Sequence, residues 1–252
     1  MGIAFVAGKN RVPRPAAGIT AFVIEDFAMH LRLQISTPYD VGMPADEIAN
    51  QKRALRAELR ERRRNKPFVT TERETEQLTQ RLQALVSGLR ATSLSAYLSA
   101  PTEPNTRPFL NWARDAGIRT LLPISRVDGL LDWTTGDGES EVVSHLGWPE
   151  AAGELLGPMA IDEVDVILVP AASVDRSGMR LGWGKGYFDK MLGSMGKCPP
   201  VFAVLFDDEL VDEVPRERHD EPVDGVVTPS RIVPLSKRAK ALGLPEGQTL
   251  PE

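Results

Sequence analysis

The chain has 252 residues, 42% of them hydrophobic, and a formal net charge of −5. This length and composition suffice for the core of one α/β domain or two small ones. The acidic balance excludes general nucleic-acid binding, and no apolar run approaches the roughly 20 residues that span a bilayer, so neither nucleic acid nor a membrane is an expected partner. The single cysteine, Cys198, fits a reducing compartment, and the first residues lack the pattern of a signal peptide, so a cytoplasmic location is expected.

Residues 1–46 contain four prolines among short segments of ambiguous periodicity, and we interpret them as an N-terminal extension whose use the sequence does not decide. One domain is expected over residues 47–236. Residues 237–252 are charged and then rich in glycine and proline, which predicts a frayed C-terminal tail.

A first helix is predicted from Asp46, interpreted as its N-cap, to about Arg64. Its apolar residues form one stripe, and many basic residues occupy the rest, which usually indicates a solvated face. Lys52 and Arg56 are spaced i and i+4, so they share one face and can reach the same anion.

Regular elements then alternate along the chain, with a turn-rich stretch over residues 128–153 that predicts a short hairpin or excursion. Helices are predicted over residues 71–89, 105–116 and 186–192, and strands over 94–99, 119–123, 164–169, 201–205 and 225–227. Alternating strands and helices predict an α/β fold, a three-layer α/β/α sandwich with a mainly parallel, Rossmann-like sheet covered on both faces.

The segment from Gly178 to Leu192 reads GMRLGWGKGYFDKML and combines four glycines with cationic and acidic residues. It follows the β-branched run VDVILVP, so we expect it at the carboxyl end of a buried strand, where open α/β sheets bind ligands. Glycines let backbone N–H groups approach an anion. The motif is not the common phosphate loop, because Gly186 rather than serine or threonine follows Lys185. A glycine-rich turn with solvated charges remains the structural alternative.

Several motifs together resemble one family in order and spacing. They are RLGWGKGYFD, the preceding strand VDVILVPAASVD, the basic helix beginning at Lys52, Glu103 after SAYLSA, and His219 with Asp220 before VDGVVT. The chain resembles 5-formyltetrahydrofolate cyclo-ligase, also called methenyltetrahydrofolate synthetase, from about Gln51 to Pro234.

The resemblance implies an ATP- and Mg²⁺-dependent conversion of 5-formyltetrahydrofolate to 5,10-methenyltetrahydrofolate, with release of ADP and phosphate. The intermediate that we expect is a phosphorylated formyl group, an iminium phosphate. The expected partners are 5-formyltetrahydrofolate and its polyglutamates, and the protein is expected to be a monomer.

The resemblance also assigns roles to residues. Lys185, Arg180 and Tyr187 are the expected catalytic residues, and Asp189 and Asp220 the expected Mg²⁺ ligands. The expected ATP contacts are Lys52, Arg53, Ala54, Leu55, Arg56, Arg180, Leu181, Gly182, Trp183, Gly184, Lys185, Gly186, Tyr187 and Phe188. The expected folate contacts are Arg56, Leu98, Glu103, Trp183, Gly184, Lys185, Gly186 and Tyr187. His219 is expected to be a neighbour rather than a catalyst.

Structural alternatives exist for the acidic residues. Asp189 also fits an ordinary first-turn helix acid, Asp220 a residue of a charged turn, and Glu103 a surface acid in a proline-rich turn.

Two other classes of protein would use the same loop. A non-catalytic nucleotide-binding regulator would need neither Glu103 nor a second ligand cleft. A kinase acting on another small metabolite would need both.

Overall fold

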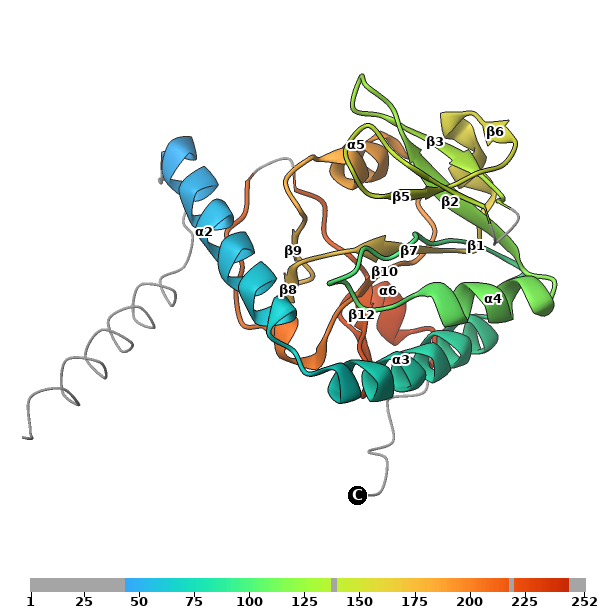
Figure 1. Cartoon of the computed structure of the whole chain (residues 1–252), viewed down its shortest axis with the longest axis horizontal. Helices are drawn as coiled ribbons and strands as arrows, with labels where there is room; N and C mark the ends of the chain where they lie inside the picture. The colour runs from blue at the N-terminus through green and yellow to red at the C-terminus, as the bar shows by residue number, and fades with distance from the viewer. Residues whose placement is uncertain (1–43, 137–139, 218–219, 245–252) are drawn as a thin grey trace, which may run out of the picture. The chain divides into compact units, whose positions relative to one another are not determined.

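The centre of the molecule is an eight-stranded sheet with the strand order β13-β12-β10-β7-β1-β2-β3-β6 (Figure 1). The structure is a computed structural model that describes residues 44–136, 140–217 and 220–244. The chain divides into two units, residues 1–38 and 39–252, and every described residue belongs to the second. The predicted N-terminal extension therefore lies outside the described residues, except at its end.

Five neighbouring strands of this sheet run parallel, and antiparallel strands complete both edges. The parallel strands are β12 (Gly225–Val227), β10 (Val201–Val204), β7 (Val166–Pro170), β1 (Ser93–Ser95) and β2 (Arg119–Ser125). The edge strands are β13 (Ile232–Pro234), β3 (Leu131–Thr134) and β6 (Leu155–Leu156). The expected mainly parallel sheet is confirmed.

Helices cover both faces of the sheet. The core on one face includes residues of α3 (Phe68–Leu89), α4 (Arg107–Asp115) and α6 (Lys237–Lys240). The core on the other face includes residues of α5 (Tyr187–Ser194) and the 3-10 helix η1 (Pro158–Glu163). The arrangement is the predicted three-layer sandwich. None of the helices in the described ranges is long and apolar enough to cross a membrane.

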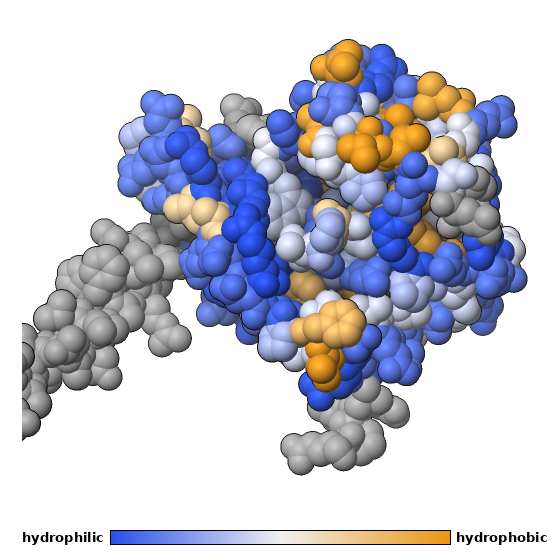
Figure 2. Space-filling model, in the orientation of Figure 1, coloured by the Kyte–Doolittle hydropathy of each residue, from blue (hydrophilic) through white to orange (hydrophobic). Residues whose placement is uncertain are grey.

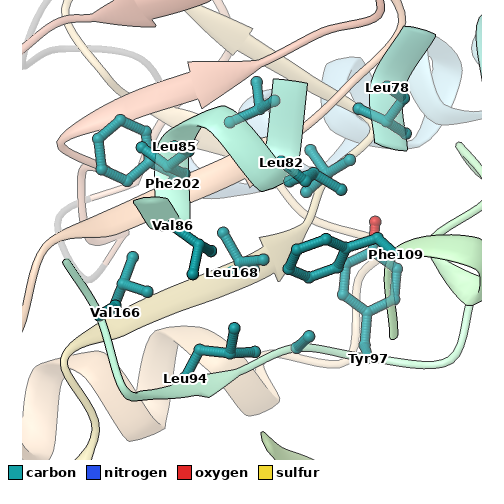
Figure 3. Packing of buried hydrophobic residues seen from close by; sticks show 14 of the residues in the cluster. Leu78, Leu82, Leu85, Val86, Leu94, Tyr97, Phe109, Val166, Leu168 and Phe202 are labelled. Atoms are coloured by element: carbon teal, nitrogen blue, oxygen red, sulfur yellow. The ribbon is translucent and has the colours of Figure 1, made fainter. Parts of the chain in front are cut away.

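The alternation of side chains along β7 explains why its sequence is continuously apolar. Val166 and Leu168 pack with leucines of α3, including Leu82 (Figure 3). Ile167 and Val169 point to the opposite face and belong to the core that includes Met191 of α5. A strand buried on both faces needs apolar residues at every position, which is the pattern VILV.

A second, three-stranded sheet with the order β11-β8-β9 separates β7 from the glycine-rich loop. Its strands are β8 (Ser173–Asp175), β9 (Arg180–Leu181) and β11 (Leu210–Val211). The sequence prediction did not include this sheet between the buried strand and the loop. The β8–β9 hairpin intervenes, and α2 (Ala45–Arg64) packs on it through Leu59, which contacts the cluster containing Leu181.

Two boundaries differ from the sequence prediction, and the predicted hairpin is present. The first helix begins at Ala45 with Pro44 as N-cap, so Asp46 lies in the first turn and is not the cap. The excursion contains the predicted hairpin, formed by β4 (Glu141–Val143) and β5 (Pro149–Ala151). The domain boundary at residue 236 is too early, because the predicted tail contains α6 and the core includes Ala239 and Leu244.

Candidate active site

A cavity of about 380 Å³ lies where β1, β2 and β7 end. Its wall includes Leu98 and Glu103 after β1, Ser125 at the end of β2, and Pro170 at the end of β7. The glycine-rich loop supplies another wall. The loop residues that line the cavity are Arg180, Gly182, Trp183, Lys185, Gly186, Tyr187, Phe188 and Asp189. The structure therefore brings Glu103, Leu98 and this loop together around one cavity.

Two glycines of the loop have backbone conformations that other residues rarely adopt. Gly184 has a φ of 96° and Gly186 a φ of 70°. Gly186 is also the N-cap of α5, so the loop turns directly into that helix. Lys185 lies exposed between them, and no hydrogen bond or ion pair fixes its ammonium group within the described part of the chain. Its position leaves this charge available to a ligand in the cavity.

Arg56 connects the basic helix to the loop. Its Nε atom donates a hydrogen bond of 2.6 Å to the carbonyl oxygen of Gly182. A Cβ atom on Gly184 would lie 3.3 Å from the Arg56 guanidinium group, so the loop and the side chain are in close contact. Burial and the nearby charge of Arg60 lower the pKa of Arg56 from its ordinary value. Arg56 and the glycine-rich loop, which the sequence linked only by resemblance, are thus in direct contact.

Arg180 is buried beneath the loop, and both terminal nitrogens of its guanidinium group form hydrogen bonds. Its Nη2 atom lies 2.6 Å from the Oδ1 atom of Asp189, and its Nη1 atom donates to the carbonyl oxygen of Pro170 over 3.3 Å. Only 2% of the Arg180 side chain is exposed, against 17% for Asp189. The predicted catalytic arginine and one predicted metal ligand therefore form an ion pair.

Lys52 and the other predicted metal ligand form a second ion pair. The Lys52 ammonium lies 2.5 Å from Asp220 and 2.8 Å from Glu217, and its side chain is 6% exposed. Asp220 also accepts the backbone N–H of Glu217 over 2.7 Å. His219 lies outside the described residues. Lys52 does not line the cavity in the structure as described, so any contact with a phosphate needs this side chain to change partner.

The acidic residues near Arg56 suit a magnesium ion that travels with a nucleotide. Asp220, Glu217 and Asp189 all act on the Arg56 guanidinium and raise its pKa, against the larger effect of burial. No group of three or more His, Cys, Asp or Glu side chains within the described ranges could hold a metal alone. Mg²⁺ is usually bound by one or two carboxylates together with phosphates and water. These carboxylates fit a Mg²⁺ site completed by phosphates and water, and they do not fit a site made of protein ligands alone.

Glu103 lies in the turn after β1, and its Oε2 atom accepts the backbone N–H of Ala100 over 2.9 Å. Burial raises the pKa of this carboxyl from its ordinary value, although the Ala100 N–H, the charge of Arg63 and the nearby Trp183 side chain oppose the rise. Glu103 is therefore not a surface acid. It is a half-buried acceptor facing a cavity that is otherwise largely apolar.

Tyr187 contributes its ring rather than a free hydroxyl. The hydroxyl donates a 2.7 Å hydrogen bond to the carbonyl oxygen of Arg126, and burial raises its pKa. The ring packs edge-on against Trp148 with the centroids 6.5 Å apart. This bond occupies the hydroxyl, and the catalytic role of Tyr187 stays a prediction.

Other predicted contacts lie at the edge of the site or beneath it. Arg53 and Ala54 are exposed on α2, whose outward face is strongly hydrophilic (Figure 2). Leu55 and Leu181 belong to the apolar cluster under α2, and Leu181 is completely buried. Only the backbone of Leu181 could touch a nucleotide.

The sequence did not indicate several residues of the site. Arg60 lines the cavity one helical turn beyond Arg56, and this spacing could have identified it. Glu150 also lines it and accepts the N–H of Ser125 over 2.8 Å and the Ser125 hydroxyl. Trp148 donates to the same hydroxyl over 3.1 Å. Glu150 and Trp148 come from the irregular excursion, where no periodic pattern marks a buried residue.

An α/β enzyme with a cationic, glycine-rich loop facing a mainly apolar cavity is the class that this arrangement defines. The model of the 5-formyltetrahydrofolate cyclo-ligase family matches residues 48–229, and the chain belongs to that family. It is an enzyme of this family, a ligase of folate and one-carbon metabolism.

Curated relatives agree with this assignment, and solved structures share the fold. The chain is 37% identical over 187 residues to 5-formyltetrahydrofolate cyclo-ligase of Mycolicibacterium smegmatis, covering 71% of this chain and 94% of the relative. It is 30% identical over 182 residues to the Escherichia coli K12 enzyme of the same name, covering 69% and 98%. The fold is similar to that of 5,10-methenyltetrahydrofolate synthetase of Aquifex aeolicus, with a TM-score of 0.61, 24% identity and 80% and 96% of the chains covered. A synthetase structure from Mycoplasma pneumoniae gives a TM-score of 0.58 at 18% identity, covering 71% and 98%.

Proposed function

We propose that the protein converts 5-formyltetrahydrofolate to 5,10-methenyltetrahydrofolate, with ATP hydrolysed to ADP and phosphate. The observation that carries this proposal is the shared cavity, which has Lys185 and Arg180 in one wall and Glu103 in another. Cations at a glycine-rich loop suit a triphosphate, and a half-buried carboxylate suits a ligand with N–H donors. Family membership supplies the identity of the folate.

The reaction has a specific chemical difficulty, because a formamide carbonyl is a poor electrophile and its oxygen a poor leaving group. In the proposed sequence, the formyl oxygen attacks the γ-phosphorus, a new O–P bond forms, and the bond to ADP breaks. N10 then attacks the iminium phosphate carbon and loses its proton. The C–O bond breaks, phosphate leaves, and the methenyl ring closes.

Phosphoryl transfer requires positioning and charge neutralisation more than covalent chemistry from the protein. Lys185 is exposed in the cavity wall and is our choice for the γ-phosphate and its transition state. Arg180, buried and bonded to Asp189, is fixed in place to support the phosphate-binding loop. Arg56 holds the Gly182 carbonyl and so orients the same loop.

Asp189 and Asp220 are the residues that would hold Mg²⁺ together with the phosphates. When bound, the ion neutralises phosphate charge. Each carboxylate is already paired with a cationic side chain, Arg180 and Lys52 respectively. These partners orient the two carboxylates in the partly buried site.

Glu103 is the proposed acceptor for the N–H groups of the pterin. Leu98 lines the cavity on the same side and supplies apolar wall. Trp183, Tyr187 and Phe188 also line it and offer aromatic surface to a planar ring. We further propose that folate polyglutamates are accepted, that the protein acts as a monomer, and that it acts in the cytoplasm.

One experiment separates this function from its rivals. Purified protein is incubated with Mg²⁺ and ATP, with and without 5-formyltetrahydrofolate, and both ADP and the absorbance of the methenyl product are measured. The proposal expects ADP and product in equal amounts and no ADP without the folate. A kinase acting on another metabolite would give neither, and a nucleotide-binding regulator would bind ATP without turnover. Either result would exclude the proposal.

A further inference from the structure

A completely enclosed ion pair lies beneath the loop, between Arg63 at the end of α2 and Glu209 in the 3-10 helix η2 (Asp207–Glu209). The Nε and Nη2 atoms of Arg63 bind the two carboxylate oxygens of Glu209 at 2.6 and 2.7 Å. Both side chains are 1% exposed. A charge pair buried this deeply usually stabilises a fold no better than apolar residues of similar size, so its presence asks for another reason.

The surrounding bonds make this pair rigid. Arg63 Nη2 also donates to the carbonyl oxygen of Ala171 over 2.9 Å, next to the end of β7. Glu209 Oε2 accepts the N–H of Phe206 over 2.9 Å, and the Glu209 carbonyl oxygen accepts the hydroxyl of Ser173 over 2.7 Å. The planar guanidinium group is therefore fixed in position and in orientation.

The guanidinium group lies against Trp183, the aromatic residue of the glycine-rich loop. The Arg63 Cζ atom is 4.9 Å from the centroid of the Trp183 ring, and Arg60, one turn earlier on α2, is 5.3 Å from it. Both distances are within the range of a cation–π contact. The Trp183 ring also packs against the apolar cluster that contains Leu59 and Leu181, and the two guanidinium contacts add to this support.

The Trp183 ring so held borders the part of the cavity that contains Glu103. Trp183 and Arg63 both act on the Glu103 carboxyl, and Tyr97 lines the cavity beside them. The Tyr97 Oη atom is buried and has no hydrogen-bond partner among the residues that the structure describes, whereas the Trp183 side chain acts on the Glu103 carboxyl. Buried donors of this kind are rarely left unpaired, so an acceptor from a ligand or a water is expected there.

We infer that the Arg63–Glu209 pair positions Trp183, and that the indole held by it sets the affinity of the site for the folate. This inference rests on the proposed function, because the folate is the ligand placed beside Glu103. Arg63 is a positioning residue here. Tyr97 presents its buried donor to an acceptor atom on the substrate, beside the indole.

The test replaces the pair by uncharged residues of similar size, Arg63→Met with Glu209→Gln. A single substitution would leave a buried charge unpaired and could unfold the protein, whereas the double variant avoids this, and its glutamine can still accept the Phe206 N–H. The matched control is Arg62→Met with Asp208→Asn. It removes the neighbouring exposed ion pair, 3.3 Å long, between the same two elements.

We expect the Arg63→Met/Glu209→Gln variant to raise KM for 5-formyltetrahydrofolate about tenfold, the size of one partly desolvated cation–π contact. The KM for ATP and kcat should stay within about twofold, and the control should match the parent. In a Trp183→Phe background, the same pair of substitutions should add little, because both act through the indole. An unchanged KM for 5-formyltetrahydrofolate would overturn the inference. The same increase in this KM with and without Trp183 would also overturn it.

A second measurement does not depend on turnover. Acrylamide quenching of the Trp183 fluorescence, taken as the difference between each protein and its Trp183→Phe form, reports how freely the ring is exposed. The double variant should be quenched more strongly than the parent and the control. Equal quenching would show that the pair does not hold the ring. Absence of turnover in the parent would instead reject the proposed function. The quenching result would still test whether the pair holds the ring.

Discussion

The Nη2 atom of Arg180 lies 2.6 Å from the Oδ1 atom of Asp189, and this bond closes the glycine-rich loop on itself. The two residues stand at opposite ends of the loop, one in β9 and one in the first turn of α5. Because the pair is largely buried, it fixes the distance between strand and helix. The loop between them, which also contacts Arg56 of α2, can then present Lys185 and its backbone N–H groups to the cavity.

Asp189 in this bond is also an expected Mg²⁺ ligand, so its substitution should change how the reaction rate depends on the Mg²⁺ concentration. Asp189→Asn and Asp220→Asn should each raise the Mg²⁺ concentration for half-maximal rate by about tenfold or more, the scale on which partners of metal sites act. The double variant should be little worse than the weaker single variant, because carboxylates on one ion act as a unit. Initial rates over a magnesium titration measure this.

Two controls accompany that titration. Asp212→Asn removes an exposed carboxylate paired with Arg176 and should leave the curve unchanged. Thermal unfolding should be recorded for Asp220→Asn, since the side chain is only 8% exposed and binds Lys52. Both acids are mostly buried. A titration that overlays the parent would remove the residue concerned from the site.

Lys185→Ala should lower kcat about 100- to 1,000-fold, as expected for the loss of one electrostatic stabiliser of a transition state. The melting temperature should not change, because the exposed side chain makes few contacts. Lys190→Ala is the matched control, an exposed lysine five residues later on α5. Near-parent activity of Lys185→Ala would show that this lysine is an ordinary solvated charge.

Much of this fold follows from local patterns. The run VILV is buried on both faces of the sheet, so its composition alone identified a central strand. The glycines of the loop were informative because Gly184 and Gly186 use conformations that other residues avoid. Glu103 could be placed because it follows a strand end, where parallel sheets gather their functional residues.

The remaining features depend on contacts between distant residues. The strands of the β8–β9 hairpin are short and polar at several positions, so no periodicity distinguishes them from the loop that they precede. Arg63 and Glu209 are 146 residues apart, and Arg63 looks like any other member of a basic run until its partner is known. The sequence therefore predicted a solvated face at a position that is completely buried.

Gly184→Ala tests the contact between loop and basic helix. The left-handed backbone should cost about 1–3 kcal/mol for a residue with a side chain, and the new Cβ would press on Arg56 at 3.3 Å. We expect lower stability in urea and a reduced kcat/KM, because Arg56 must shift from the Gly182 carbonyl. Gly157→Ala is the control, since its Cβ would meet nothing within 4 Å. Equal behaviour of the two variants would contradict the proposed role of this contact.

Asp165 provides a prediction about stability and pH. Its Oδ2 atom accepts the N–H and hydroxyl of Thr92 at 2.8 and 3.1 Å and those of Ser93 at 2.9 and 2.9 Å, which joins the segments entering β1 and β7. Desolvation favours the neutral acid, but these bonds outweigh it and lower the pKa below the ordinary 3.8.

A carboxyl whose pKa is lower in the folded state stabilises the fold above the unfolded pKa and loses that effect as the pH falls through the folded value. The free energy of unfolding of the parent should therefore exceed that of Asp165→Asn at pH 7, and the difference should shrink once the pH falls below about 3.8. Urea denaturation at several pH values measures it, with Asp162→Asn as an exposed control nearby. A difference that stays constant from pH 7 to pH 3 would show that the charge of Asp165 does not act through these hydrogen bonds.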